Sequence, residues 1–139
     1  MKKQIFKLGL LFTILILIIS CKKDEQPLNE ILLGKWYWIK TITPYGGQET
    51  NPRTEGYSRV FVFMENGKML EYRNNILSDS SDYSLEINSS NSNTYRITNS
   101  TIINSLFYFE ADTLIFSEVY VDGPVIYFVK GLPPVAIPL

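Results

Sequence analysis

Between Lys35 and Lys130 the sequence repeats one pattern: short segments rich in aromatic and β-branched residues, separated by clusters of Gly, Asn, Asp and Ser. Such segments favour strands, and Asn66-Gly67 is a strong signal for a tight hairpin because both turn positions need positive φ. No segment here has the length of a helix that connects parallel strands. The pattern therefore predicts an all-β fold, an antiparallel up-and-down barrel or a sandwich of about eight strands.

The expected strands are short and evenly spaced, and they cover residues 35–42, 57–65, 68–74, 83–88, 94–98, 102–109, 113–121 and 125–130. A closed barrel is favoured over a sandwich, because closure leaves no exposed strand edge. The polar segments 44–56 and 75–81 are expected to be loops, and 44–56 is long enough to be a functional one. One helical turn is expected over residues 28–33, ended by Gly34.

The first twenty residues have a different character. Lys2, Lys3 and Lys7 precede an apolar run of thirteen residues, Leu8 to Ser20. A permanent membrane helix needs about 20 such residues, so the run predicts a cleaved secretory signal peptide. The expected organisation is a signal peptide (1–20), a tether that begins with Cys21 (21–30), a barrel (31–131) and a Pro-rich tail (132–139). A chain of 139 residues suffices for one such domain.

Charge and composition exclude several function classes. Without the three signal-peptide lysines the chain has 10 basic and 14 acidic residues, a net charge of −4, which argues against binding nucleic acid. The sequence has no His and one Cys, so it lacks the usual acid–base residue, a thiolate zinc site and an intramolecular disulfide. Asp79 and Asp82 do not complete a calcium-loop pattern. We therefore expect a non-enzyme with neither metal nor cofactor.

The end of the signal segment, Ile18-Ile19-Ser20-Cys21, resembles the lipobox of bacterial lipoproteins. The resemblance implies a diacylglycerol on the Cys21 thiol, cleavage after Ser20 and an acylated new amine, with palmitate among the expected acyl chains. The alternative is an ordinary signal peptide followed by a free thiol. Lys22-Lys23-Asp24-Glu25 resembles a surface-export tag, or it is only a solvated tether. The implied location is the outer membrane, on its periplasmic face or at the cell surface.

The start of the expected barrel also resembles a known family. Gly34-Lys35-Trp36 opens the first strand, and Phe61-Val62-Phe63 leads into the Asn-Gly turn. This layout resembles the lipocalins, and more narrowly the lipocalin-like lipoproteins of Gram-negative bacteria. It implies that Trp36 plugs one end of the barrel, with Lys130 as the candidate basic residue against its indole. The 44–56 loop would overhang the open end. Only nine residues follow Lys130, so the C-terminal helix of the family is not expected here.

Eight aromatic residues are expected to point into the barrel: Trp36, Trp38, Phe61, Phe63, Tyr72, Tyr83, Tyr95 and Phe116. They either fill the core or line an apolar cavity near the open end. The leading hypothesis is a membrane-anchored envelope lipoprotein that binds a small hydrophobic ligand. The alternative is a filled barrel that binds or inhibits another envelope protein, with no small-molecule ligand.

Overall fold

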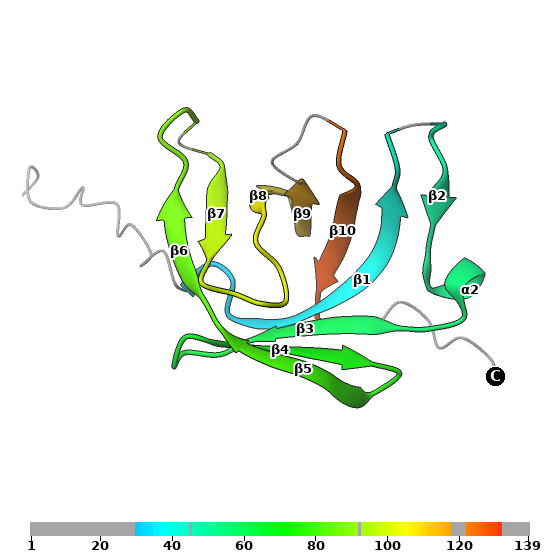
Figure 1. Cartoon of the computed structure of the whole chain (residues 1–139), viewed down its shortest axis with the longest axis horizontal. Helices are drawn as coiled ribbons and strands as arrows, with labels where there is room; N and C mark the ends of the chain where they lie inside the picture. Colours follow the sequence, from blue (N-terminus) through cyan, green and yellow to red (C-terminus); the bar gives the residue numbers. More distant parts are fainter. Residues whose placement is uncertain (1–29, 45, 92, 118–121, 132–139) are drawn as a thin grey trace, which may run out of the picture.

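The computed structural model describes residues 30–44, 46–91, 93–117 and 122–131 (Figure 1). The predicted signal peptide, Cys21 and the Pro-rich tail lie outside the described residues. The described part of the chain forms ten strands and one short helix: β1 (Gly34–Ile42), β2 (Glu49–Thr50), α2 (Pro52–Glu55), β3 (Arg59–Phe63), β4 (Lys68–Arg73), β5 (Ile76–Asp82), β6 (Ser84–Ile87), β7 (Tyr95–Thr98), β8 (Leu106–Glu110), β9 (Thr113–Ser117) and β10 (Val125–Lys130).

The strands form one antiparallel sheet in the order β5-β4-β3-β1-β10-β9-β8-β7-β6, and β2 pairs with β1 beside this path. The first long strand thus pairs with the last, in a register that joins Trp36 to Lys130. The two ends of the path, β5 and β6, are consecutive in the chain and separated by Tyr83 alone. The chain therefore runs directly from one end of the strand order to the other, which brings the two edges of the sheet together (Figure 1). The predicted antiparallel barrel is confirmed, in a nearly closed form.

Some predicted boundaries are wrong. The segment 75–81, expected to be a polar loop, is mostly strand β5, which is held by backbone pairing with β4 although most of its side chains are exposed. The 44–56 loop contains β2 and α2. The strand expected at 102–109 begins only at Leu106, because Ser100 and Ser81 accept hydrogen bonds from backbone groups of residues 101–103 and hold that segment as a loop.

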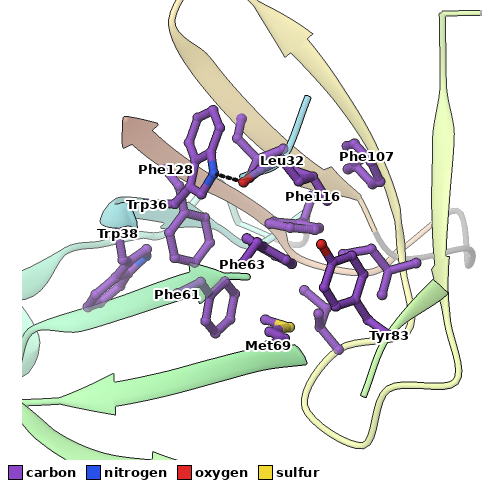
Figure 2. Close-up of a cluster of buried hydrophobic side chains, with 13 residues drawn as sticks. Leu32, Trp36, Trp38, Phe61, Phe63, Met69, Tyr83, Phe107, Phe116 and Phe128 are labelled. Atoms are coloured by element: carbon purple, nitrogen blue, oxygen red, sulfur yellow. Dashed lines mark hydrogen bonds between the residues drawn. The ribbon is translucent and has the colours of Figure 1, made fainter. Parts of the chain in front are cut away.

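Aromatic rings from several strands meet in the centre of the barrel (Figure 2). Phe61 stacks on Phe128 with ring centroids 4.7 Å apart, and Phe116 meets both rings edge-on at 6.1 and 5.6 Å. Burial of such rings is the largest contribution that single side chains make to a core. The buried cluster consists of Leu32, Trp36, Trp38, Phe61, Phe63, Met69, Tyr83, Ile97, Ile103, Phe107, Leu114, Phe116 and Phe128.

Trp36 closes one end of this core, which we call the base. Its indole Nε1–H donates to the Leu32 carbonyl at 2.7 Å, so the helical turn before β1 is tied to the first strand (Figure 2). The Nζ atom of Lys130 lies 5.4 Å from the centroid of the Trp36 ring, the contact expected for that lysine. Gly34, at φ 114°, lets the chain enter β1 with the Lys130 side chain close by.

Candidate functional site

The structure brings most of the predicted aromatic residues together. Seven of the eight belong to the core or pack against it: Trp36, Trp38, Phe61, Phe63, Tyr83 and Phe116 are buried, and Tyr95 is partly buried. The Tyr95 ring stacks on Phe107 at 5.3 Å. These rings therefore pack against one another and against other side chains of the core.

The prediction for Tyr72 is wrong. Alternation along β4 places Met69 and Glu71 in the interior, at 0% and 4% exposure, while Leu70 and Tyr72 lie half-buried on the opposite face. Hydrophobicity alone predicts the reverse, with Leu70 and Tyr72 in the interior and the Glu71 carboxylate in water. The interior accepts Glu71 because neighbouring side chains compensate its charge. This compensation cannot be recognised from the alternation of apolar residues along one strand.

Two arginines bind the buried Glu71 carboxylate. Its Oε1 atom accepts hydrogen bonds from Nε of Arg59 at 2.8 Å and from Nε of Arg73 at 2.9 Å, and the Glu71 side chain is 6% exposed. The β3–β4 register explains this geometry, since Arg59 lies opposite Arg73 and Phe61 lies opposite Glu71. The bond to Glu71 and its negative charge raise the pKa of Arg73. The Arg59 guanidinium also lies 4.6 Å from the Phe61 ring.

A stack of planar groups lies beside this ion pair cluster. The rings of Trp38 and Tyr57 are 5.4 Å apart and nearly parallel, and the Arg73 guanidinium lies 5.7 Å from the Tyr57 ring. The Trp38 indole also donates to Thr41 Oγ1 at 3.0 Å. Tyr57 directly follows the 44–56 segment, so these side chains occupy the end of the interior where that segment was expected to overhang an opening. We call this end the α2 end.

A shallow apolar pocket lies at the other end of β3. Its volume is about 460 Å³, and it is lined by Leu33, Gly34, Phe63, Met64, Glu65 and Asn66. It lies where the β3–β4 turn meets the start of β1, beside the base. Because β3 runs from Arg59 to Phe63, this pocket and the Glu71 cluster lie at opposite ends of the strand.

The acidic side chains of the described residues do not gather into a metal site. They contain no group of three His, Cys, Asp or Glu side chains placed to hold a metal ion. Asp82 pairs with Lys68 at 3.5 Å, and the Oδ1 atom of Asp79 accepts the backbone N–H of Ser80. In the same part of the chain, no helix is long and apolar enough to cross a membrane.

The Glu71 cluster was not predicted, although the sequence contains a signal for Arg59, Glu71 and Arg73. A hairpin turn sets the register of its two strands. With Phe63 opposite Met69 after the Asn66-Gly67 turn, counting by two along both strands places Glu71 opposite Phe61 and Arg73 opposite Arg59, so both arginines lie one step from Glu71 on the same face. Two cations and one anion on one face predict an ion pair cluster.

The fold thus defines a class, an antiparallel and nearly closed β-barrel with an aromatic core. Comparisons of the chain with protein-family models, with curated proteins and with solved structures find no match. Proposals on function therefore depend on the sequence and on the geometry described above.

Proposed function

We propose that this protein is a lipoprotein anchored in the outer membrane, whose filled barrel binds or inhibits another envelope protein. The anchor follows from the signal segment and the lipobox-like residues before Cys21. The observation that carries the interaction role is the packing of the interior. Trp36 occupies the base, the stacked Phe61 and Phe128 rings occupy the centre, and the Glu71 cluster occupies the α2 end.

The packing of the centre favours this role over that of a ligand carrier. A ligand site usually needs a cavity of about 300–1,000 Å³ that buries most of the ligand surface. A small barrel either encloses one ligand or is filled by side chains. Here Phe61 contacts Phe128 face to face and Phe116 edge to face, so a ligand in the centre would have to separate these rings.

Binding of a small hydrophobic molecule is the second candidate, at a different place from the one expected. The pocket beside the base has a volume of about 460 Å³, and Leu33, Phe63 and Met64 supply apolar lining. This size suits a small ligand, but the pocket is open to solvent along one side. A ligand there would contact the outside of the core rather than its centre.

Incorporation of radiolabelled palmitate tests the anchor. We expect label on the wild-type chain and none on the Cys21→Ser variant, because that substitution removes the thiol that takes the diacylglycerol. Absence of label from the wild type, or label that persists in Cys21→Ser, would show that the anchor is assigned incorrectly.

Native mass spectrometry of the detergent-solubilised chain separates the two binding roles. We expect the mass of the acylated chain alone, and no change in tryptophan fluorescence when 1-anilinonaphthalene-8-sulfonate is added. A co-purified hydrophobic molecule in a one-to-one ratio would instead support the ligand carrier. In that case Met64→Asp, which places a charge in the pocket beside the base, is expected to release the molecule.

A further inference from the structure

The turn between β4 and β5 is held rigidly. Asn74 and Asn75 both have positive φ, 50° and 64°, which is the geometry of a two-residue hairpin turn matched to the twist of its strands. The Asn74 backbone N–H donates to the Ser58 carbonyl at 3.1 Å, and its Oδ1 atom accepts the Ser58 N–H at 2.8 Å. The turn is thus fixed to the segment that precedes β3. We call residues 73–77 the β4–β5 tip.

The tip exposes two consecutive branched aliphatic residues, Ile76 and Leu77, whose side chains lie on opposite faces of β5 because side chains alternate along a strand. Ile76 is 72% exposed and Leu77 is 52% exposed, and they are two of the four large hydrophobic residues that are exposed in the described part of the chain. Single exposed apolar residues are ordinary, but two at the tip of a preorganised hairpin can be buried together by a partner that encloses the tip. A binding partner that buries them would lose little free energy in ordering the turn.

Arg73 adds a positive group beside Ile76. It pairs with Ile76 across the hairpin, and its side chain is 53% exposed. Only its Nε atom is needed for the bond to Glu71, whereas a guanidinium has four further N–H donors in a fixed fork. The tip therefore combines an apolar pair with donors that suit a carboxylate.

Two other modes of contact fit the tip less well. Addition of a strand to the free edge of β5 is disfavoured by the register irregularity opposite Glu71 and Tyr72 and by Asp79 and Asp82 on that strand. The same two acids disfavour an anionic membrane surface. In Figure 1 the tip lies at the right of the view, whereas the segment before β1, in blue, lies at the left.

We propose that the β4–β5 tip docks into an apolar pocket of a partner protein that carries an Asp or Glu carboxylate at its rim. The pocket encloses the tip from both faces, so that it buries Ile76 on one face and Leu77 on the other, and the carboxylate accepts hydrogen bonds from the Arg73 guanidinium on the Ile76 face. This inference rests on the interaction role proposed above, and it assigns that role to one surface.

Site-specific photocrosslinking in the cells that produce the full chain tests this docking. The photoreactive residue p-benzoylphenylalanine replaces Ile76 in the tip. It also replaces Ile87, 60% exposed on β6, and Ala111, exposed in the β8–β9 turn, as matched controls. We expect position 76 to crosslink one protein, at a peptide that contains Asp or Glu among apolar residues, and position 87 to give no such product.

Two further substitutions make the result specific. Arg73→Gln is expected to lower the yield at position 76 about tenfold, the loss expected for one charge-assisted hydrogen bond. Leu77→Ser is expected to lower it as well, and this exposed residue can change without disturbing the core. Urea unfolding of each variant checks that it folds. An unchanged yield in both variants would overturn the proposal.

The remaining outcomes are also decisive. Crosslinks from position 76 only to lipid, only to a second copy of the chain, or equally from positions 76 and 87 would refute docking by the tip. A partner captured at Ala111 but not at position 76 would refute the tip while leaving the interaction role intact. No protein product at any of the three positions would contradict both.

Discussion

Replacing Trp36 by Ala removes three interactions at the base of the barrel. The indole is 2% exposed, and its Nε1–H donates to the Leu32 carbonyl at 2.7 Å. Its ring centroid lies 5.4 Å from the Lys130 Nζ atom and 5.7 Å from the Phe109 ring centroid. The substitution therefore opens a cavity and leaves a buried carbonyl without its donor.

The size of the effect follows from these contacts. Deletion of a buried aromatic side chain costs about 3–5 kcal/mol of unfolding free energy. A carbonyl that loses its partner in a buried site costs about 1–3 kcal/mol, part of which is already included in that range. We therefore expect a loss of about 4 kcal/mol for Trp36→Ala. Trp36→Phe retains most of the ring but not the donor, and we expect it to cost about 1–2 kcal/mol.

Urea unfolding measures both variants. Trp38, the other of the two tryptophans, reports the transition by its fluorescence, because it is 3% exposed in the folded state. A loss below about 1 kcal/mol for Trp36→Ala, within the range of surface substitutions, would show that the first strand is placed in the wrong register. Equal losses for the Ala and Phe variants would show that the Leu32 hydrogen bond carries the whole effect.

Three further predictions concern the Glu71 cluster, the start of β1 and the pH dependence of stability. Glu71→Gln leaves the Arg59 and Arg73 guanidinium groups adjacent without a negative charge, and urea unfolding should show a loss of about 3 kcal/mol; an unchanged midpoint contradicts this. Gly34→Ala places a residue with a side chain at φ 114° and should lower the free energy of unfolding, measured by thermal denaturation, by about 1–3 kcal/mol. A neutral effect would argue against this backbone conformation at Gly34. Burial raises the pKa of Tyr83, so the unfolded state loses this proton at lower pH than the folded state. Stability should therefore fall as the pH rises above about 10, and less steeply in Tyr83→Phe; equal slopes would refute it.

Much of the fold could be predicted because local signals agreed with one another. Alternating aromatic and β-branched residues define β1, β3 and β10, and the Asn66-Gly67 turn sets the β3–β4 pairing. Strand β5 escaped prediction because residues 78–82 (SDSSD) contain no apolar side chain. Its strand conformation comes from backbone pairing with β4, a non-local cause that hydrophobic periodicity does not register.

The candidate site was harder to predict than the fold. Seven of the aromatic residues in or against the core were predicted, but Phe107 and Phe128, both fully buried, were not. Tyr72 was assigned to the wrong face because a carboxylate at Glu71 was assumed to face water. Burial of that carboxylate becomes favourable only when two guanidinium groups reach it. One arginine comes from β3 and the other from β4, so the reason becomes visible only after the two strands are paired.

Arg73 links the interior of the barrel to the proposed docking surface. Its Nε atom is bound to the buried Glu71, while more than half of its side chain is exposed beside Ile76. A free arginine side chain loses rotamer entropy when it binds a partner, by about 1 kcal/mol or more. Glu71 removes part of that loss in advance, because it already holds the guanidinium in place. Apolar residues of similar volume would often stabilise a barrel as well as a buried ion pair does, so stability alone does not explain Glu71. On the proposed docking, Glu71 orients a cation at the surface, and the Asn74-Asn75 turn orients Ile76 and Leu77.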